Sequence, residues 1–310
     1  MSEPIEVVFL GTGGGVPSAR RFLPAMALRR GGEWFLFDAG EGVQMRIRQS
    51  PLGWAGLRAI FISHLHGDHV LGLPGLLMSI GMAKMEAPLE VFAPRGLQRL
   101  IDTVLQVCRV QLPFPVTVRC LENESATILR GSGYRIDAAP LRHRAPCWGF
   151  FFREDERPGR FFPEKAQALG VPAGPLYKEL QSGRVVELPD GVVVRPADVM
   201  GPDRPGRVVA YCTDTLPCRE TVQYSLGADL LIHDATFGEG LEDEARISGH
   251  STAAQAAEIA RAAGARRLAL THISARYDAD APLLESARQV FPNSVMAADL
   301  LRLSVDAQEA

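Results

Sequence analysis

Short apolar runs separated by glycine or polar turns make up most of this chain. Runs of about 4–8 residues rich in β-branched and aliphatic side chains are typical of buried strands. Gly31 and Gly32 separate two such runs and predict a hairpin. The expected strands are residues 5–10, 25–30, 33–40, 57–63, 89–94, 207–214, 228–235 and 266–272. Strands and helices are expected to go on alternating through residues 116–121, 126–131 and 134–141.

Apolar residues recur at helical spacing in several other segments. The expected helices are residues 72–83 (helical after Pro74), 96–108, 218–227 and 251–264. In the last of these, Ser251 is expected to be the N-cap and Gly264 the left-handed residue that closes the helix. The alternation of strands and helices predicts an α/β fold.

Residues 153–207 differ in amino-acid composition from the rest of the chain. They contain 15 Gly or Pro among 55 residues, whereas the whole chain has 52 among 310. This enrichment in turn formers predicts an irregular insertion with short helical pieces. The segment holds nine Lys or Arg and nine Asp or Glu, so it has no net charge.

Length and composition place the chain among ordinary globular proteins. At 310 residues it exceeds the usual size of one domain, and we expect either one large domain with an insertion or two domains. Hydrophobic residues make up 46% and charged residues 22%, enough to form a sizeable core. The net charge of −3 argues against nucleic-acid binding by bulk attraction, so any such contact has to be local.

The five cysteines are odd in number and show no CxxC spacing. They predict neither a disulfide framework nor a cysteine zinc site, and we interpret them as free thiols in a reducing compartment. The amino-terminal stretch lacks a basic segment followed by an apolar one, and no apolar run approaches the length of a membrane span. We therefore expect a cytoplasmic protein that does not enter a membrane.

Residues 63–69 read SHLHGDH and hold three of the seven histidines. Residues two apart in an extended segment point the same way, so His64 and His66 are suited to sharing one metal ion. Asp68 and His69 would face elsewhere, toward a second ion, and paired ions are suited to phosphate-ester hydrolysis. A solvated polar turn is the alternative, but crowded imidazoles repel one another when protonated.

Other metal-ligating residues lie far apart in the sequence. Asp214, His233 and His272 each come at the end of an apolar strand, the edge where α/β proteins collect active-site residues. His143 follows an expected strand, and His250 precedes an expected helix. Each alone is consistent with a structural role, whereas their common placement favours a site.

Several longer motifs narrow this picture. HLHGDH matches the HxHxDH signature of the metallo-β-lactamase superfamily. The further motifs are FLGTGGGVPS near the start, FDAGEGVQ at 37–44, GLPGLL at 72–77, PGRFFPEKAQALGVPAGPL at 158–176, and GHSTAAQAAEIA with LALTHISARY within 249–277. With them the chain resembles the tRNase Z (ribonuclease Z) family. The resemblance implies an αββα sandwich over residues 1–310, with residues 153–207 as a protruding tRNA-binding arm.

The resemblance also implies a site with two zinc ions per subunit. The implied ligands are His64, His66 and His143 for the first ion, Asp68, His69 and His272 for the second, and Asp214 as a bridge. Asp68 would also be the acid-base residue that orients the attacking hydroxide, and His250 would stabilise or protonate the departing oxygen. His233 and Asp234 would orient His250 or the ligands.

The implied activity is endonucleolytic removal of the 3′ trailer from precursor tRNA by a homodimer, with the arm of one subunit serving the other's active site. In the arm, RNA contacts are expected from Arg157, Arg160, Lys165 and Lys178, although a solubilising loop is the alternative. Two other functions stay open, a hydrolase of small esters or phosphodiesters and a non-catalytic RNA-binding scaffold.

The chain departs from the family pattern at three places. Ala19 and Phe22 stand where the family has Lys and Asn, in a loop associated with sensing the tRNA 3′ end. Asp234 replaces a glutamate, for which we expect a small geometric effect. Cys212 and Thr213 replace small residues.

Overall fold

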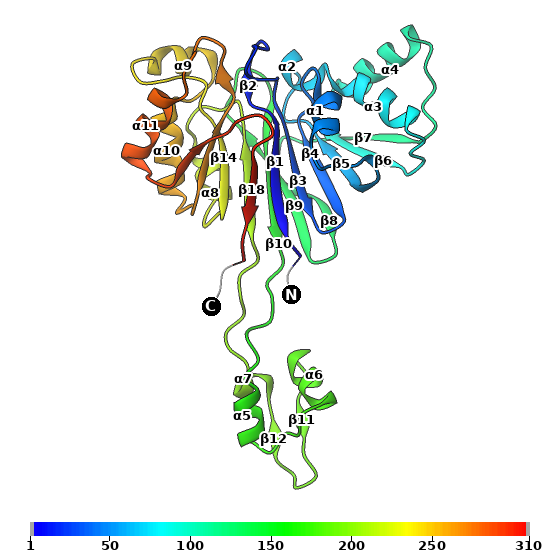
Figure 1. The fold of residues 1–310 in the computed structure, drawn as a ribbon, viewed down its shortest axis with the longest axis vertical. Coiled ribbons are helices and arrows are strands. Elements are labelled where there is room, and N and C mark those ends of the chain that lie inside the picture. Colours follow the sequence, from blue (N-terminus) through cyan, green and yellow to red (C-terminus); the bar gives the residue numbers. More distant parts are fainter. Residues whose placement is uncertain (1–2, 308–310) are drawn as a thin grey trace. The chain divides into compact units, whose positions relative to one another are not determined.

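Two seven-stranded sheets form the framework of the protein in a computed structural model that describes residues 3–307 (Figure 1). The first sheet has the order β18 (Arg302–Val305), β1 (Ile5–Gly11), β3 (Ala25–Arg30), β4 (Glu33–Phe37), β5 (Leu57–Phe61), β6 (Leu89–Ala93) and β7 (Val116–Cys120). The second has the order β17 (Ser294–Met296), β15 (Leu268–Thr271), β14 (Leu230–Asp234), β13 (Val208–Cys212), β10 (Cys147–Glu154), β9 (Tyr134–Leu141) and β8 (Ala126–Gly131).

Both sheets are mixed. Strands β4 to β7 run parallel in the first sheet, and β13, β14, β15 and β17 run parallel in the second. The pairs β1–β3, β3–β4, β8–β9 and β10–β13 are antiparallel. The parallel strands of each sheet therefore bring their carboxyl ends to one edge.

Helices cover the outer face of each sheet. In β4, Phe35 and Phe37 belong to the core between the sheets, whereas Trp34 and Leu36 belong to the cluster beneath the first helical layer. Burial on both faces explains why the strands read as continuous apolar runs. The first layer contains α1 (Val43–Gln49), α3 (Leu73–Met82) and α4 (Leu97–Val107), and the second α8 (Arg219–Tyr224), α10 (Ala253–Ala262) and α11 (Ala281–Val290). The expected αββα sandwich is confirmed.

Shorter elements complete the body. They are β2 (Gly13–Gly14), η1 (Trp54–Gly56), α2 (Gly67–Val70), α9 (Glu242–Ser248) and β16 (Ile273–Ser274). β2 pairs in parallel with β16, which places the first glycine-rich turn beside the residue that follows β15. Within residues 3–307, no helix combines the length and apolar character that a membrane crossing requires.

Two sequence predictions are wrong in detail. Residues 116–141 contain β7, β8 and β9 without a helix between them, because a two-residue turn at Ser132 and Gly133 closes β8 and β9 into a hairpin. The N-cap of α10 is Thr252 and not Ser251, since the Thr252 side chain accepts a hydrogen bond from the amide of Gln255. Gly264 does adopt the expected left-handed conformation, with φ of 60°.

Residues Glu154–Arg207 form a second compact unit, the arm, whereas the body consists of the residues up to Arg153 and Val208–Asp306. The arm contains α5 (Pro163–Ala168), α6 (Pro175–Gln181), α7 (Pro196–Val199) and a ribbon of β11 (Val186–Glu187) and β12 (Val193–Val194). Three prolines each begin a helix, where a missing N–H costs nothing. The arm has its own apolar cluster, which includes Val171, Leu180 and Val199.

The two ends of the arm are paired. Arg207 forms a buried ion pair with Glu154, with Nε 2.7 Å from the carboxylate. Further along, the backbone N–H of Arg157 donates to the carbonyl of Arg204 at 2.9 Å, and the reciprocal bond measures 2.8 Å. Residues 157 and 204 are therefore held side by side as a two-stranded stalk.

Candidate metal centre

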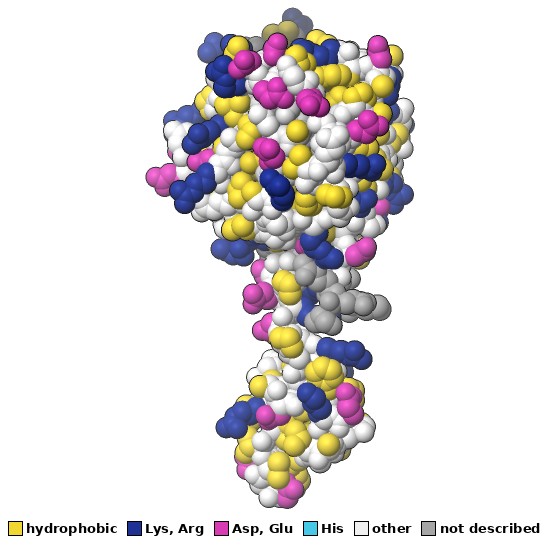
Figure 2. Space-filling model, turned by 90° about the vertical axis from the view of Figure 1, so that its left-hand side faces the viewer, with side chains coloured by type: hydrophobic (Ala, Val, Ile, Leu, Met, Phe, Trp, Pro, Cys, Tyr) yellow, Lys and Arg dark blue, Asp and Glu magenta, His cyan; other side chains and the backbone are white. Residues whose placement is uncertain are grey.

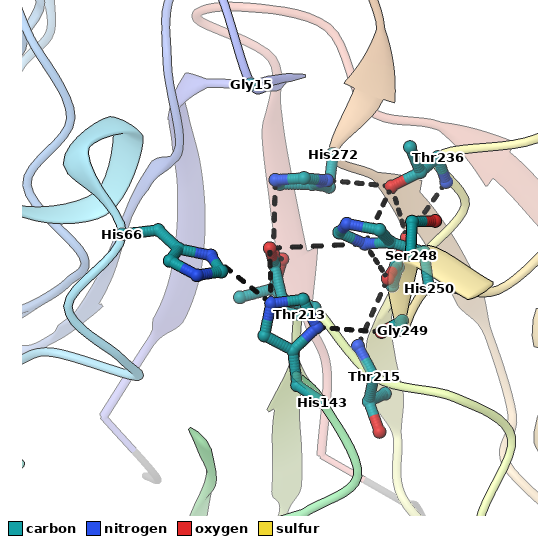
Figure 3. A network of polar contacts seen from close by, with 12 residues as sticks. Gly15, His66, His143, Thr213, Thr215, Thr236, Ser248, Gly249, His250 and His272 are labelled. Atoms are coloured by element: carbon teal, nitrogen blue, oxygen red, sulfur yellow. Dashed lines mark hydrogen bonds and ion pairs between the residues drawn. The ribbon is translucent and has the colours of Figure 1, made fainter. Parts of the chain in front are cut away.

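Most of the candidate residues lie at or just beyond the ends of strands. His64 and His66 follow β5 in the first sheet, whereas Asp214 and His272 follow β13 and β15 in the second. Figure 3 shows His66, His143, His250 and His272 around one centre, although they come from distant parts of the chain. The convergence of strand ends thus builds the site.

The first group of possible ligands contains His64, His66, His143 and Asp214, whose ligand atoms all lie within 4.8 Å of one another. Nε2 of His143 lies 3.3 Å from Nδ1 of His66. Nδ1 of His143 lies 2.8 Å from the carbonyl oxygen of Gly249. Because a carbonyl only accepts, this Nδ1 carries the proton, and the Nε2 lone pair faces the group.

The second group contains Asp68, His69 and His272, again with ligand atoms within 4.8 Å of one another. Nε2 of His69 and Nε2 of His272 lie 3.6 and 3.4 Å from Oδ2 of Asp68. Asp214 faces both groups, since its Oδ1 lies 3.1 Å from Nε2 of His272 and its Oδ2 lies 3.5 Å from Nε2 of His64. One carboxylate therefore stands between two sets of imidazoles.

The ligand atom of His250 also lies within 4.8 Å of those of Asp214 and His272, but His250 has a closer partner of its own. Its Nδ1 is 2.8 Å from Oδ2 of Asp234 and 4.0 Å from Oδ2 of Asp214. Burial opposes protonation of His250, yet the charge of Asp234, its hydrogen bond to His250 and the charge of Asp214 together outweigh burial and raise the pKa to about 9. His250 is thus a cation near neutral pH, which suits a proton donor better than a ligand.

The residues fit a divalent cation. Nε2 of His64 is buried and, within residues 3–307, has no hydrogen-bond partner. Burial, followed by the nearby His69, lowers the pKa of His64 to about 2, so its lone pair is available. Burial raises the pKa of Asp68, but the hydrogen bond with His272 and the charges of His69 and His272 together outweigh it, and the net shift is downward. Imidazole nitrogens and carboxylate oxygens without thiolates are a donor set typical of catalytic zinc sites.

Asp38 is a functional residue that the sequence analysis does not predict, and it stands behind His69. This buried carboxylate accepts hydrogen bonds from Nδ1 of His69 at 2.8 Å, from the amide of Ser63 at 2.7 Å and from the hydroxyl of Tyr211 at 3.0 Å. These bonds fix the His69 ring and leave its Nε2 facing Asp68 and Asp214. Asp38 lies in the FDAGEG stretch, and that motif is the one feature of the sequence that could have pointed to its role.

Thr236 and Gly15 were also missed. The Thr236 hydroxyl donates to Oδ1 of Asp234 at 2.6 Å and lies 2.8 Å from Nδ1 of His272, from which it accepts. The amide of Gly15 donates to Oδ2 of Asp68 at 2.8 Å. Threonine and glycine carry no metal-binding signal in a sequence, so only the fold reveals these contacts.

His233 is placed apart from the other predicted residues. Its Nδ1 bonds the backbone carbonyl of Asp234 at 2.9 Å, and within residues 3–307 its buried Nε2 has no partner. Neighbouring residues of a strand point to opposite faces, so His233 faces away from the side on which Asp234 meets His250. The structure brings Asp234 to His250 but does not bring His233 there.

The departures from the family pattern have structural counterparts. The Thr213 hydroxyl donates to Oδ1 of Asp214 at 2.8 Å, a bond that helps to orient the central carboxylate. Cys212 is buried in the apolar cluster on the outer face of the second sheet. The Phe22 ring lies under the guanidinium of Arg46, 4.7 Å from its centroid, and Ala19 is exposed.

Comparison with known proteins agrees with this geometry. A family model described as a beta-lactamase superfamily domain matches residues 33–163 and 186–273. Ribonuclease Z of Salinibacter ruber is 46% identical over 310 residues, covering 98% of this chain and 96% of that protein. The chain belongs to the ribonuclease Z family. Ribonuclease Z of Methanosarcina acetivorans is 41% identical and covers 97% of this chain and 98% of its own.

Solved structures of this family share the fold. The crystal structure of the short form of human tRNase Z superposes with a TM-score of 0.68 at 28% identity, covering 97% of this chain and 99% of that one. The resemblance drawn from the sequence motifs is therefore confirmed at the level of family and fold.

Proposed function

We propose that the protein is a zinc-dependent endoribonuclease that removes the 3′ trailer from precursor tRNA and leaves a 3′ hydroxyl on the tRNA. The observation that carries the proposal is the convergence of two imidazole groups on Asp214 in a chain that matches a ribonuclease Z over 98% of its length. We place the enzyme in the cytoplasm, where its five thiols stay reduced.

Two zinc ions would bind between the groups of side chains described above. His64, His66 and His143 would hold the first ion, Asp68, His69 and His272 the second, and Asp214 would bridge them, as its two oxygens suggest. When bound, these ions supply Lewis acidity for the hydrolysis of a phosphodiester bond.

The chain's own residues would position the reactants and move protons. Asp68 accepts a hydrogen bond from the amide of Gly15, which aims its carboxylate to orient the nucleophile. His250 is protonated through Asp234 and would donate that proton to the departing oxygen. Thr236 bonds both Asp234 and His272, so it ties the proposed acid to the proposed ligand set.

The arm would supply local contacts to the RNA. Arg160 and Lys165 are exposed and lie near Phe162, at 5.9 and 4.6 Å from its ring centroid, and Lys178 is exposed on α6. Exposed cations beside an aromatic ring are suited to phosphates and bases. Arg157 is half-buried, with Nε and Nη2 lacking hydrogen-bond partners within residues 3–307. These four residues are the proposed RNA contacts.

The surface supports local contacts over bulk attraction. In Figure 2, basic and acidic side chains are interspersed on the visible face of each unit. This distribution agrees with the net charge of −3. We further propose that two copies form a homodimer in which one arm serves the partner's site, which sedimentation analysis of the purified protein tests.

The deciding experiment uses a labelled precursor tRNA with a 3′ trailer, with the product ends mapped to the nucleotide. We expect one cut at the 3′ end of the tRNA body and poor cleavage of an unstructured RNA of equal length. Stepwise shortening from the 3′ end would show an exonuclease. Equal cleavage of both RNAs would indicate a general phosphodiesterase. Substrates with and without CCA test the loop that carries Ala19 and Phe22.

A further inference from the structure

Arg276 lies in the turn after β16 and is held in place by neutral contacts. Its guanidinium carbon lies 4.8 Å from the centroid of the Phe237 ring. Its Nε donates to the hydroxyl of Ser274 at 3.2 Å. The side chain is exposed, so these contacts hold a charged group in a defined orientation at the surface.

Phe237 provides a rigid base for this guanidinium. Phe237 is buried, and its carbonyl accepts a hydrogen bond from the amide of Ala253 at 2.9 Å. The next residue, Gly238, donates its amide to the hydroxyl of Tyr277 at 2.6 Å, which ties the turn of Arg276 to the same segment. The Phe237 and His250 ring centroids lie 6.1 Å apart. Phe237 therefore neighbours both the guanidinium of Arg276 and the ring of His250.

The charge of Arg276 is not neutralised. Within residues 3–307 no carboxylate forms an ion pair with it, in contrast to exposed arginines such as Arg246, which pairs with Asp243 at 3.0 Å. Among the described residues, Nε is the one guanidinium nitrogen of Arg276 that forms a hydrogen bond, so both terminal nitrogens are available. A guanidinium with two free terminal nitrogens matches the oxygens of a phosphate group.

We infer that Arg276 holds a backbone phosphate of the RNA next to the scissile bond, on the side of His250. The inference rests on the proposed function, because it assigns one residue to that same substrate. Since the aromatic base and Ser274 already fix the side chain, little conformational entropy is lost when the phosphate binds. Arg276 is on this account a positioning residue for the RNA chain.

The test compares Arg276→Ala and Arg276→Lys with the wild type on precursor tRNA and on bis(p-nitrophenyl) phosphate. The small diester has no neighbouring phosphate, so its hydrolysis by Arg276→Ala should stay within about twofold of wild type. For precursor tRNA we expect kcat/KM to fall about 10- to 100-fold, the range for a lost charged hydrogen bond. Arg276→Lys should recover part of this loss, because lysine keeps the charge without the fork.

Salt dependence separates a phosphate contact from a structural role. Removing one contact should reduce the slope of log kcat/KM against log salt concentration by about 0.7 to 0.9. Arg58→Ala is the matched control, since Arg58 is an exposed arginine at the amino end of β5, away from the site. It removes the same charge and should leave the slope unchanged.

Three other results of these measurements would contradict the assignment of Arg276. If the wild type cleaves precursor tRNA and Arg276→Ala matches Arg58→Ala in both rate and salt slope, the assignment of Arg276 is overturned while the proposed function stands. If Arg276→Ala loses activity equally on both substrates, its role is structural and the assignment is overturned as well. If the wild type cleaves only the small diester, both the proposed function and the inference are wrong.

Discussion

Backbone conformation at single residues determines how the candidate centre is built. Asp38, Asp214 and His272 all have positive φ, at 56°, 51° and 60°. A non-glycine residue in this region costs on the order of 1–3 kcal/mol and persists where the surroundings impose it. Each of the three follows directly on, or within two residues of, a strand end. The left-handed turn helps to place the side chains of Asp214 and His272 in the centre and that of Asp38 behind His69, so part of the folding free energy is used to arrange these groups.

The first prediction separates the roles of two histidines. His250→Ala should retain two metal ions per chain yet lose about 10²- to 10⁴-fold in cleavage, the usual contribution of a general acid. His66→Ala should lose metal as well as activity, because His66 belongs to the first group of possible ligands. Metal content by plasma mass spectrometry beside the cleavage rate checks both. Two bound ions in both variants would contradict this division of roles.

A second prediction concerns Gly14. A Cβ built at this position would lie 2.4 Å from the His272 ring, so Gly14→Ala has to displace that imidazole. Misplacement by about 1 Å at a catalytic group costs about 10²-fold in rate, and we expect a loss of that size together with weaker metal retention. Gly32→Ala is the control, since nothing lies within 4 Å of its Cβ. Equal activity of the two variants would show that His272 needs no such clearance.

At the residue scale, the sequence could reveal only side chains with a chemical signature. Histidines and aspartates stand out, and the structure brings six of the seven histidines to one place. Asp38 and Thr236 act through hydrogen bonds whose partners lie far away in sequence, so no local pattern marks them. His233 shows the converse, since a residue that looks functional lies on the other face of its strand.

At the scale of elements, α10 begins directly after His250 and depends on its cap. Thr252 accepts from the amide of Gln255, and the Gln255 side chain accepts from the amide of Thr252 at 2.9 Å. This reciprocal capping fixes the turn that carries His250, so the local stability of the helix end bears on the position of the proposed acid.

A third prediction tests this cap. Thr252→Val keeps the shape of the side chain but leaves the Gln255 amide unpaired, which should lower the free energy of unfolding by about 0.5–2 kcal/mol. Urea denaturation measures the change, and hydrogen exchange should be faster at the Gln255 amide. Thr252→Ser retains the hydroxyl and should keep the slow exchange of that amide. Unchanged exchange in Thr252→Val would mean that another group caps the helix.

Strands and helices of the body were predictable because their apolar faces are long and regular. The predicted strand at residues 57–63 corresponds to β5 and the predicted helix at 96–108 to α4, with ends shifted by one or two residues. Elements whose role is defined by distant pairing were not predictable. β18 is an edge strand only because it pairs with β1, nearly 300 residues earlier in the chain. Each strand of the β11–β12 ribbon in the arm is only two residues long, too short to show a periodic pattern.

At the scale of the whole molecule, the division into two units predicts separable effects. Joining residues 157 and 204 by a short glycine turn in place of residues 158–203 uses two positions that already exchange backbone hydrogen bonds. The body keeps its own core, so hydrolysis of bis(p-nitrophenyl) phosphate should stay within about twofold. Cleavage of precursor tRNA should fall by at least about tenfold in kcat/KM, because binding energy from remote parts of a substrate contributes to catalysis.

The controls for this variant lie within the arm. Lys165→Ala and Arg160→Ala leave the arm folded and should each reproduce a small part of the loss. If the arm-less variant processes precursor tRNA as well as the wild type, the arm is a solubilising loop. Loss of activity on both substrates would instead point to a damaged body.

The paired stalk also bears on how such a chain can change over time. β10 and β13 are neighbours in one sheet, and the insertion leaves from one and returns to the other. Lengthening, trimming or exchanging the inserted residues therefore alters no strand register and no residue of the metal centre. Substitutions can therefore accumulate in the arm without affecting the body, so the sequences of the two units can diverge at different rates. The same two positions offer a ready point for grafting a different binding module onto the hydrolytic body.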